Sequence, residues 1–87
     1  MRYVVLINYT DMAARETALP AHRAYLAAAR ENGVVVESGP FADGLGGMYI
    51  LDVADEGAAQ AFVAADPYTA AGMALTVRRW RSSRETN

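Results

Sequence analysis

The chain has 87 residues and a formal net charge of −2, a balance that indicates neither nucleic acid nor an anionic membrane surface as a partner. It has no cysteine, which excludes disulfides, thiolate catalysis and cysteine-based metal sites. With a single histidine, any other metal site would depend almost entirely on carboxylate ligands, so none is expected. No segment has the length of a signal peptide's apolar region or of a membrane span, so we expect one cytoplasmic domain over residues 1–87.

The first half of the chain predicts a strand, a loop, a helix and a second strand. Residues 3–9 (YVVLINY) are β-branched and aromatic, which is typical of a strand. The polar stretch 10–18 (TDMAARETA) is interpreted as a loop. A helix is expected over Leu19–Asn32, with Pro20 in its first turn, where a missing N–H costs nothing. Residues 34–38 (VVVES) predict the second strand.

The second half repeats this alternation after a glycine-rich loop that follows the second strand. Pro67 is expected to end the second helix within a residue or two. The predicted elements are a third strand at 48–53, a helix capped by Asp55 and running to about Ala65, a turn or short helix at 67–72, a fourth strand at 73–80, and a frayed polar tail at 81–87.

The order β-α-β-β-α-β predicts an α+β, ferredoxin-like fold. Two right-handed β-α-β crossovers interleaved in one antiparallel sheet give the strand order 4-1-3-2, with both helices on one face. In this topology, the start of the first helix and the end of the second helix lie at the same edge of the sheet.

Two ionisable residues fall on the buried stripes of the two helices and meet at that edge. His22 is expected in the first turn of one helix, and Asp66 at the end of the other, where a carboxylate faces the negative end of the helix dipole and needs a compensating donor. His22 supplies such a donor. The alternatives are a buried imidazole bonded to a backbone carbonyl and an aspartate that only forms a turn. The predicted stripes are Leu19, His22, Leu26 and Ala29, and Ala59, Phe62 and Asp66.

The strands contain unbroken apolar runs, VVLI, VVV and MYIL, which favour burial on both faces of the sheet. Two helices cover only one face. We therefore expect a homodimer in which a second copy covers the other, although β-propensity alone also produces short apolar runs.

With these residues in place, the chain resembles the YciI-like (YCII-related) family over essentially its whole length. The resemblance rests on the opening strand MRYVVLI, on His22, on Ser38-Gly39-Pro40 and on the motif DPY at 66–68, followed by Ala71-Gly72. It implies a dimeric α+β barrel and a catalytic histidine and aspartate at His22 and Asp66. Ser38 stands where the related "DGPF" branch has aspartate, so the chain is closer to the His/Asp type.

The residues and the resemblance together predict a small-molecule enzyme without a cofactor, acting on a cyclic or aromatic compound by elimination, isomerisation or hydration. His22 is the expected general base or acid, and Asp66 the group that orients it. Substrate contacts are expected from Ser38, Gly39, Pro40, Tyr68 and Tyr9, with Tyr9 equally interpretable as an ordinary boundary residue. The alternative is a non-catalytic ligand-binding or accessory protein that uses the same pocket.

Two other motifs are weak. The GLGG segment at 44–47 lacks the Lys-Ser/Thr partner of a phosphate loop and precedes a strand instead of a helix. The basic residues at the C-terminal end, together with a tryptophan, are one feature of proteins that bind single-stranded nucleic acid. In an acidic protein, a solvated strand end and tail is the favoured interpretation. These residues are Arg78, Arg79, Trp80, Arg81 and Arg84.

Overall fold

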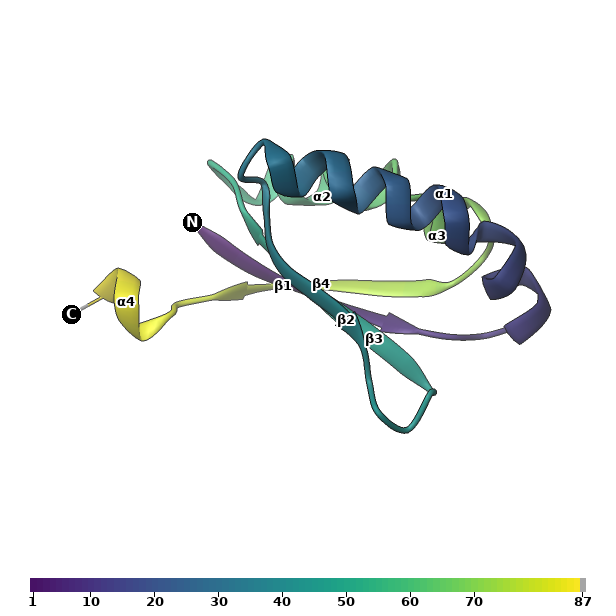
Figure 1. The fold of residues 1–87 in the computed structure, drawn as a ribbon. Helices are drawn as coiled ribbons and strands as arrows, with labels where there is room; N and C mark the ends of the chain where they lie inside the picture. Colours follow the sequence, from purple (N-terminus) through teal and green to yellow (C-terminus); the bar gives the residue numbers. More distant parts are fainter. Residues whose placement is uncertain (87) are drawn as a thin grey trace.

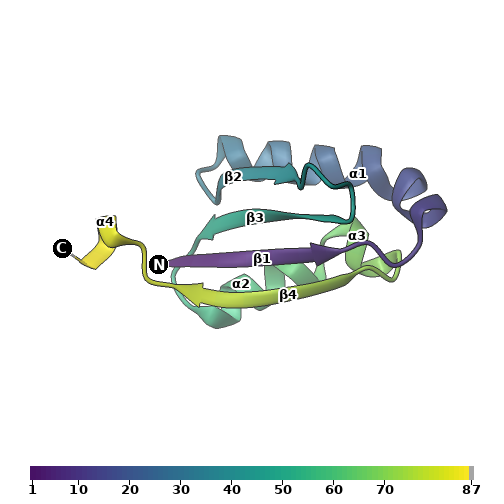
Figure 2. The same cartoon turned by 90° about the horizontal axis from the view of Figure 1, so that it is seen from below.

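A computed structural model describes residues 1–86 as an antiparallel four-stranded sheet with helices packed on it (Figure 1). The strands lie in the order β2-β3-β1-β4, which is the predicted order counted from the other edge. Figure 2 shows the same four strands side by side. The elements are β1 (Arg2–Asn8), α1 (Met12–Glu31), β2 (Val35–Pro40), β3 (Gly46–Asp52), α2 (Glu56–Ala64), α3 (Pro67–Ala70), β4 (Ala74–Trp80) and α4 (Ser83–Thr86).

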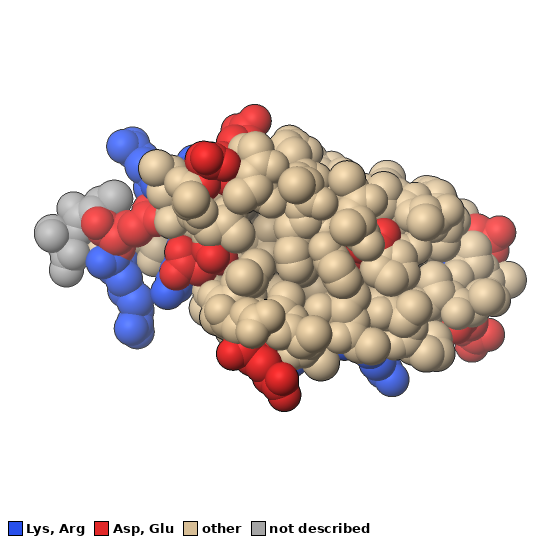
Figure 3. Space-filling model, turned by 90° about the horizontal axis from the view of Figure 1, so that it is seen from above, with Lys and Arg blue, Asp and Glu red and all other residues tan. Residues whose placement is uncertain are grey.

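The long helices α1 and α2 lie on one face of the sheet, as the topology predicted (Figure 1). Seen from that side, the molecule is mostly uncharged, and its acidic and basic side chains gather near the rim (Figure 3). No helix in the described part of the chain is both long and apolar enough to cross a membrane.

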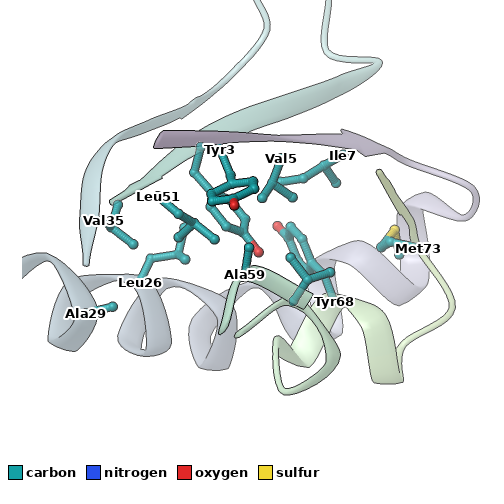
Figure 4. Packing of buried hydrophobic residues seen from close by; sticks show 12 residues of the cluster. Tyr3, Val5, Ile7, Leu26, Ala29, Val35, Leu51, Ala59, Tyr68 and Met73 are labelled. Carbon is teal, nitrogen blue, oxygen red and sulfur yellow. The ribbon is translucent and has the colours of Figure 1, made fainter. Parts of the chain in front are cut away.

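The hydrophobic core fills the layer between the sheet and the helices (Figure 4). Side chains of a strand alternate between its two faces, so every second residue of β1 points toward the helices. Those residues, Tyr3, Val5 and Ile7, are buried. From β3, Tyr49 and Leu51 join them without any exposed surface. The helices complete the core with Leu26, Ala29, Ala59 and Val63.

Helix α1 begins earlier than expected, and the predicted loop over 10–18 is wrong. Asp11 caps the helix by accepting hydrogen bonds from the backbone N–H groups of Ala13 and Ala14. The stretch that follows is rich in Ala, Arg and Glu, which are strong helix formers. Pro20 therefore lies inside the helix, where its ring removes one backbone hydrogen bond. Figure 1 shows the first turns of α1 bent away from the rest, as expected for a proline kink.

The opposite face of the sheet carries a half-buried apolar patch in the single chain. Strand alternation and the pairing register place Val4, Leu6, Met48 and Ile50 together on this face. No described helix crosses it in Figure 2. The homodimer expected from the apolar strands stays a prediction.

The tail that we expected to fray contains a short helix, α4, in its described part. The carboxylate of Glu85 accepts hydrogen bonds from the backbone N–H of Arg2 at 3.1 Å and from the Arg79 guanidinium at 3.0 Å. These contacts attach residues 83–86 to the edge of the domain; residue 87 lies outside the described residues.

Candidate active site

His22 lies on the buried face of α1, on the stripe predicted from helical periodicity. Its neighbours on that stripe, Leu26 and Ala29, are also buried, and Leu19 is half-buried. Only 6% of the residue is exposed. Because α1 begins at Met12, His22 is well inside the helix, so its predicted place in the first turn is wrong. The helix terminus consequently has little influence on the ring, since that effect fades beyond the first turn.

Asp66 begins a helix instead of ending one. Helix α2 stops at Ala64, and Ala65 is its C-cap. Asp66 is the N-cap of the short helix α3, in which Pro67 occupies the first position. Its Oδ1 accepts a hydrogen bond of 2.9 Å from the backbone N–H of Tyr68. The carboxylate therefore follows the C-cap of α2, as anticipated, and the backbone N–H of Tyr68 at the start of α3 is one of the donors that compensate it.

His22 and Asp66 meet as the sequence predicted, but the pair is buried and does not lie in an open cleft. The distance between His22 Nδ1 and Asp66 Oδ1 is 2.8 Å. The hydroxyl of Tyr49, on β3, donates to the other carboxylate oxygen, Oδ2, at 2.9 Å. Three donors from three elements thus converge on a carboxylate that is 1% exposed. With Asp66 ionised, its carboxylate can only accept, so a neutral His22 ring would donate from Nδ1 and keep a free lone pair on Nε2.

Tyr49 remains a donor over the whole ordinary pH range. Burial raises the pKa of its hydroxyl far above the usual value near 10, and the nearby Asp66 carboxylate raises it further. Burial also raises the pKa of Tyr25, whose hydroxyl donates to the Phe62 carbonyl at 2.7 Å. The Tyr49 hydroxyl that donates to Asp66 therefore stays protonated at neutral and moderately alkaline pH.

An aromatic stack extends from His22 toward the surface. The ring of Tyr68 lies parallel to the imidazole, with 3.7 Å between centroids and 5° between planes. Tyr9 meets Tyr68 edge to face at 6.2 Å. The guanidinium carbon of Arg15 lies 4.7 Å above the centre of the Tyr9 ring, within the range of a cation–π contact. The imidazole is therefore held in orientation both by its hydrogen bond and by packing.

A cavity of about 490 Å³ opens beside this stack, a size that suits a small organic molecule. The structure brings every predicted substrate-contact residue to its wall: Tyr9 and Tyr68 from the stack, and Ser38, Gly39 and Pro40 from the end of β2. His22 also lines the cavity, whereas Asp66 does not and lies behind it. Strand β2 approaches β3 closely here because Gly47 has no side chain; a Cβ there would lie 2.8 Å from the Gly39 carbonyl oxygen.

Charged residues that the sequence analysis did not select also line the cavity. Arg15, Arg23 and Arg30 come from α1; Glu37 on β2 also borders the cavity, but the pairing register places its side chain on the opposite face of the sheet. Arg30 donates a hydrogen bond to the Ser38 hydroxyl. Arg15 precedes His22 by seven residues, two helical turns, and this spacing was a usable signal. It was lost because 10–18 was interpreted as a loop.

Among residues 1–86, no three His, Asp or Glu side chains lie close enough together to hold a metal ion. The polar side chains that line the cavity carry one imidazole, the tyrosine and serine hydroxyls and the guanidinium groups. This set is suited to proton transfer and to binding of a polar organic molecule.

Comparison with known proteins agrees with this fold. A family model described as the YCII-related domain matches residues 1–81. One solved structure, 5-chloro-2-hydroxyhydroquinone dehydrochlorinase (TftG) from Burkholderia phenoliruptrix AC1100 in complex with 2,5-dihydroxybenzoquinone, is similar at a TM-score of 0.81. Its sequence is 23% identical, and the match covers 100% of both chains. No curated protein sequence matches significantly.

Proposed function

The chain belongs to the YCII-related family, and on this premise we propose that it is a small-molecule enzyme in which His22 transfers a proton. The observation that carries the proposal is the buried hydrogen bond between His22 Nδ1 and Asp66 Oδ1. It leaves Nε2 as the basic atom beside a cavity of substrate size. Asp66 holds the ring and stabilises the imidazolium that forms when Nε2 accepts a proton.

Elimination from a hydroxylated ring is the reaction that we would assay first. In such a step His22 Nε2 takes a proton from the substrate, the released electron pair forms a double bond, and the leaving group departs with its own pair. The similar dehydrochlorinase supports this choice, since its name denotes loss of hydrogen chloride from a chlorinated hydroxyquinol. Isomerisation and hydration use the same proton transfer without an anionic leaving group and are the second assays.

The test compares His22→Asn with Asp55→Asn, an exposed aspartate cap outside the cavity. Chloride release from 5-chloro-2-hydroxyhydroquinone and turnover of phenols, lactones and enol acids are measured, together with binding of 2,5-dihydroxybenzoquinone. We expect His22→Asn to lower kcat by about 100-fold or more, while Asp55→Asn leaves it unchanged. Full turnover by His22→Asn would contradict the proposal. Binding by the wild-type protein without turnover of any compound would favour a non-catalytic ligand-binding protein.

We further propose that the active form is a homodimer whose subunits meet through the helix-free face of the sheet. The half-buried patch of Val4, Leu6, Met48 and Ile50 supports this, because a second copy removes its apolar surface from water. By the pairing register, Arg78 on one edge strand and Glu37 on the other share this face. In a two-fold symmetric dimer, Arg78 of each copy can therefore lie opposite Glu37 of the other.

The assembly is tested by sedimentation at micromolar concentration. The wild-type protein should sediment as a dimer, and Leu6→Arg, which places a charge in the patch, should sediment as a monomer. Ala24→Arg, at an exposed position of α1, is the matched control and should remain a dimer. A stable wild-type monomer would refute the assembly.

A further inference from the structure

The charges on the cavity wall are predominantly positive. Three arginines line it together with His22, and the side chain of Glu37, the one acidic residue beside it, lies on the opposite face of the sheet by the pairing register. The three arginines differ in how strongly each can bind a charged group of a ligand. Arg30 is bonded to the Ser38 hydroxyl, and both Arg30 and Arg23 are exposed to solvent, where charge interactions are weak.

Arg15 is different because it is half-buried and incompletely bonded. Its Nε is buried and has no hydrogen-bond partner within the described structure. A buried N–H without an acceptor lowers the stability of the protein. A ligand that supplies the acceptor therefore gains more binding free energy at Arg15 than at a solvated arginine. Its guanidinium is fixed above the Tyr9 ring, and Tyr9 in turn contacts Tyr68, which covers His22. One continuous stack therefore connects the Arg15 guanidinium, whose Nε has no partner, with the proton-transfer group.

We propose that Arg15 is the specificity-determining residue of the cavity and that the substrate is a small, planar, conjugated oxyanion. Its negatively charged oxygen binds to Arg15, and the rest of the molecule extends along the cavity toward His22 Nε2. The apolar part of the wall, from Ile7, Leu19 and Leu26, accommodates the uncharged body of the ligand. The role of Arg15 rests on the proposed function in one respect, that the cavity beside His22 is the substrate site.

The negatively charged oxygen of such a substrate belongs either to a carboxylate or to an ionised phenol. Matched probes distinguish the two groups. Benzoate is compared with benzamide, and 4-nitrophenolate with 4-nitroanisole, so that each pair differs mainly in charge. Binding is followed through the NMR signals of the His22 ring, which are unambiguous because the chain has one histidine. The wild-type protein should bind at least one anion about ten-fold or more tightly than its neutral partner, as expected for a charge-assisted hydrogen bond.

The variant Arg15→Gln should lose this preference, with about a ten-fold weaker affinity for the anion and an affinity for the neutral partner within about two-fold of wild type. Arg15→Lys keeps the charge but not the planar fork and should retain part of the preference. Arg84→Gln, an exposed arginine in α4, removes the same charge elsewhere and should behave as wild type.

Equal binding of anion and neutral partner by the wild-type protein would overturn the assignment. It would also be overturned if Arg15→Gln weakens both partners equally, if Arg84→Gln has the same effect, or if no probe shifts the His22 signals at millimolar concentration. His22→Asn separates this inference from the proposed function, because it should abolish turnover while the anion preference, read by calorimetry, persists. If turnover survives in His22→Asn, the proton-transfer role fails and the Arg15 assignment stands.

Discussion

Asp55 and Asp66 both cap helices, and each accepts a hydrogen bond from a backbone N–H near the start of the helix that follows it. The Asp55 carboxylate accepts from Ala58 at 2.8 Å, and that of Asp66 accepts from Tyr68 at 2.9 Å. Asp55 is exposed, whereas Asp66 is buried and accepts two further hydrogen bonds, from His22 and Tyr49. Residue type and capping role are therefore shared, and the difference lies in burial and in partners from distant parts of the chain.

The largest difference is expected when each carboxylate is removed. Asp66→Ala leaves a buried imidazole N–H, a buried hydroxyl and a backbone N–H without their acceptor, and should lower the free energy of unfolding by about 3 to 5 kcal/mol. Asp55→Ala removes an exposed cap and should cost about 1 kcal/mol. Urea denaturation measures both values. Equal losses would show that capping alone explains Asp66.

A smaller effect is expected when the third donor to Asp66 is removed. Tyr49→Phe takes away a hydrogen bond to a charged acceptor and should lower stability by about 1.5 to 3 kcal/mol. Tyr25→Phe is the control, since its hydroxyl donates to a neutral carbonyl and its loss should cost about 1 kcal/mol. If the two variants unfold at the same urea concentration, the hydrogen bond from Tyr49 to Asp66 contributes no more stability than a hydrogen bond to a neutral carbonyl.

The same hydroxyl predicts a dependence of stability on alkaline pH. The pKa of Tyr49 is raised in the folded protein, so above about pH 10 the unfolded chain loses this proton while the folded chain keeps it. Stability should then fall as pH increases, by about 1.4 kcal/mol per pH unit for this group, and be unaffected by it at neutral pH. Tyr49→Phe should show a shallower decline between pH 10 and 11. An unchanged slope would mean that Tyr49 ionises normally in the folded state.

The most subtle difference concerns the tautomer of His22. With the carboxylate present, the neutral ring should carry its proton on Nδ1, which is visible in its ¹⁵N chemical shifts. Asp66→Asn replaces an acceptor-only group by an amide that both donates and accepts, so the shifts should move toward a mixture of tautomers. Asp55→Asn should leave them unchanged. A wild-type ring protonated on Nε2 would remove the free base from the cavity.

Much of the fold was predictable because it depends on local patterns and on handedness. Strand composition located all four strands to within two residues, and the right-handed crossover rule then left one strand order. The start of α1 was missed since polar Thr10-Asp11 was interpreted as part of a loop, although aspartate before an alanine-rich segment is also an N-cap signal. Treating Pro20 as a helix start followed from that choice.

The candidate site was predictable only in part. Helical phase and topology identified His22 and Asp66, and the residues at the ends of β1 and β2 were placed beside them correctly. Tyr49 was not identified, because on β3 its pattern is that of any core residue. Arg15 was not identified because its helix was not predicted at that position.

The amino-acid sequence by itself determined the elements, their order and the faces that they bury, since these depend on propensity and periodicity over short segments. Tertiary structure alone decided that the side chains of His22 and Tyr49 and the backbone N–H of Tyr68 converge on one carboxylate. Residues 22, 49 and 66 are far apart in the chain, and their contact depends on the register of β3 and on how α1 packs against it. No local pattern encodes such a distance, because hydrogen bonds require positions accurate to a few tenths of an ångström.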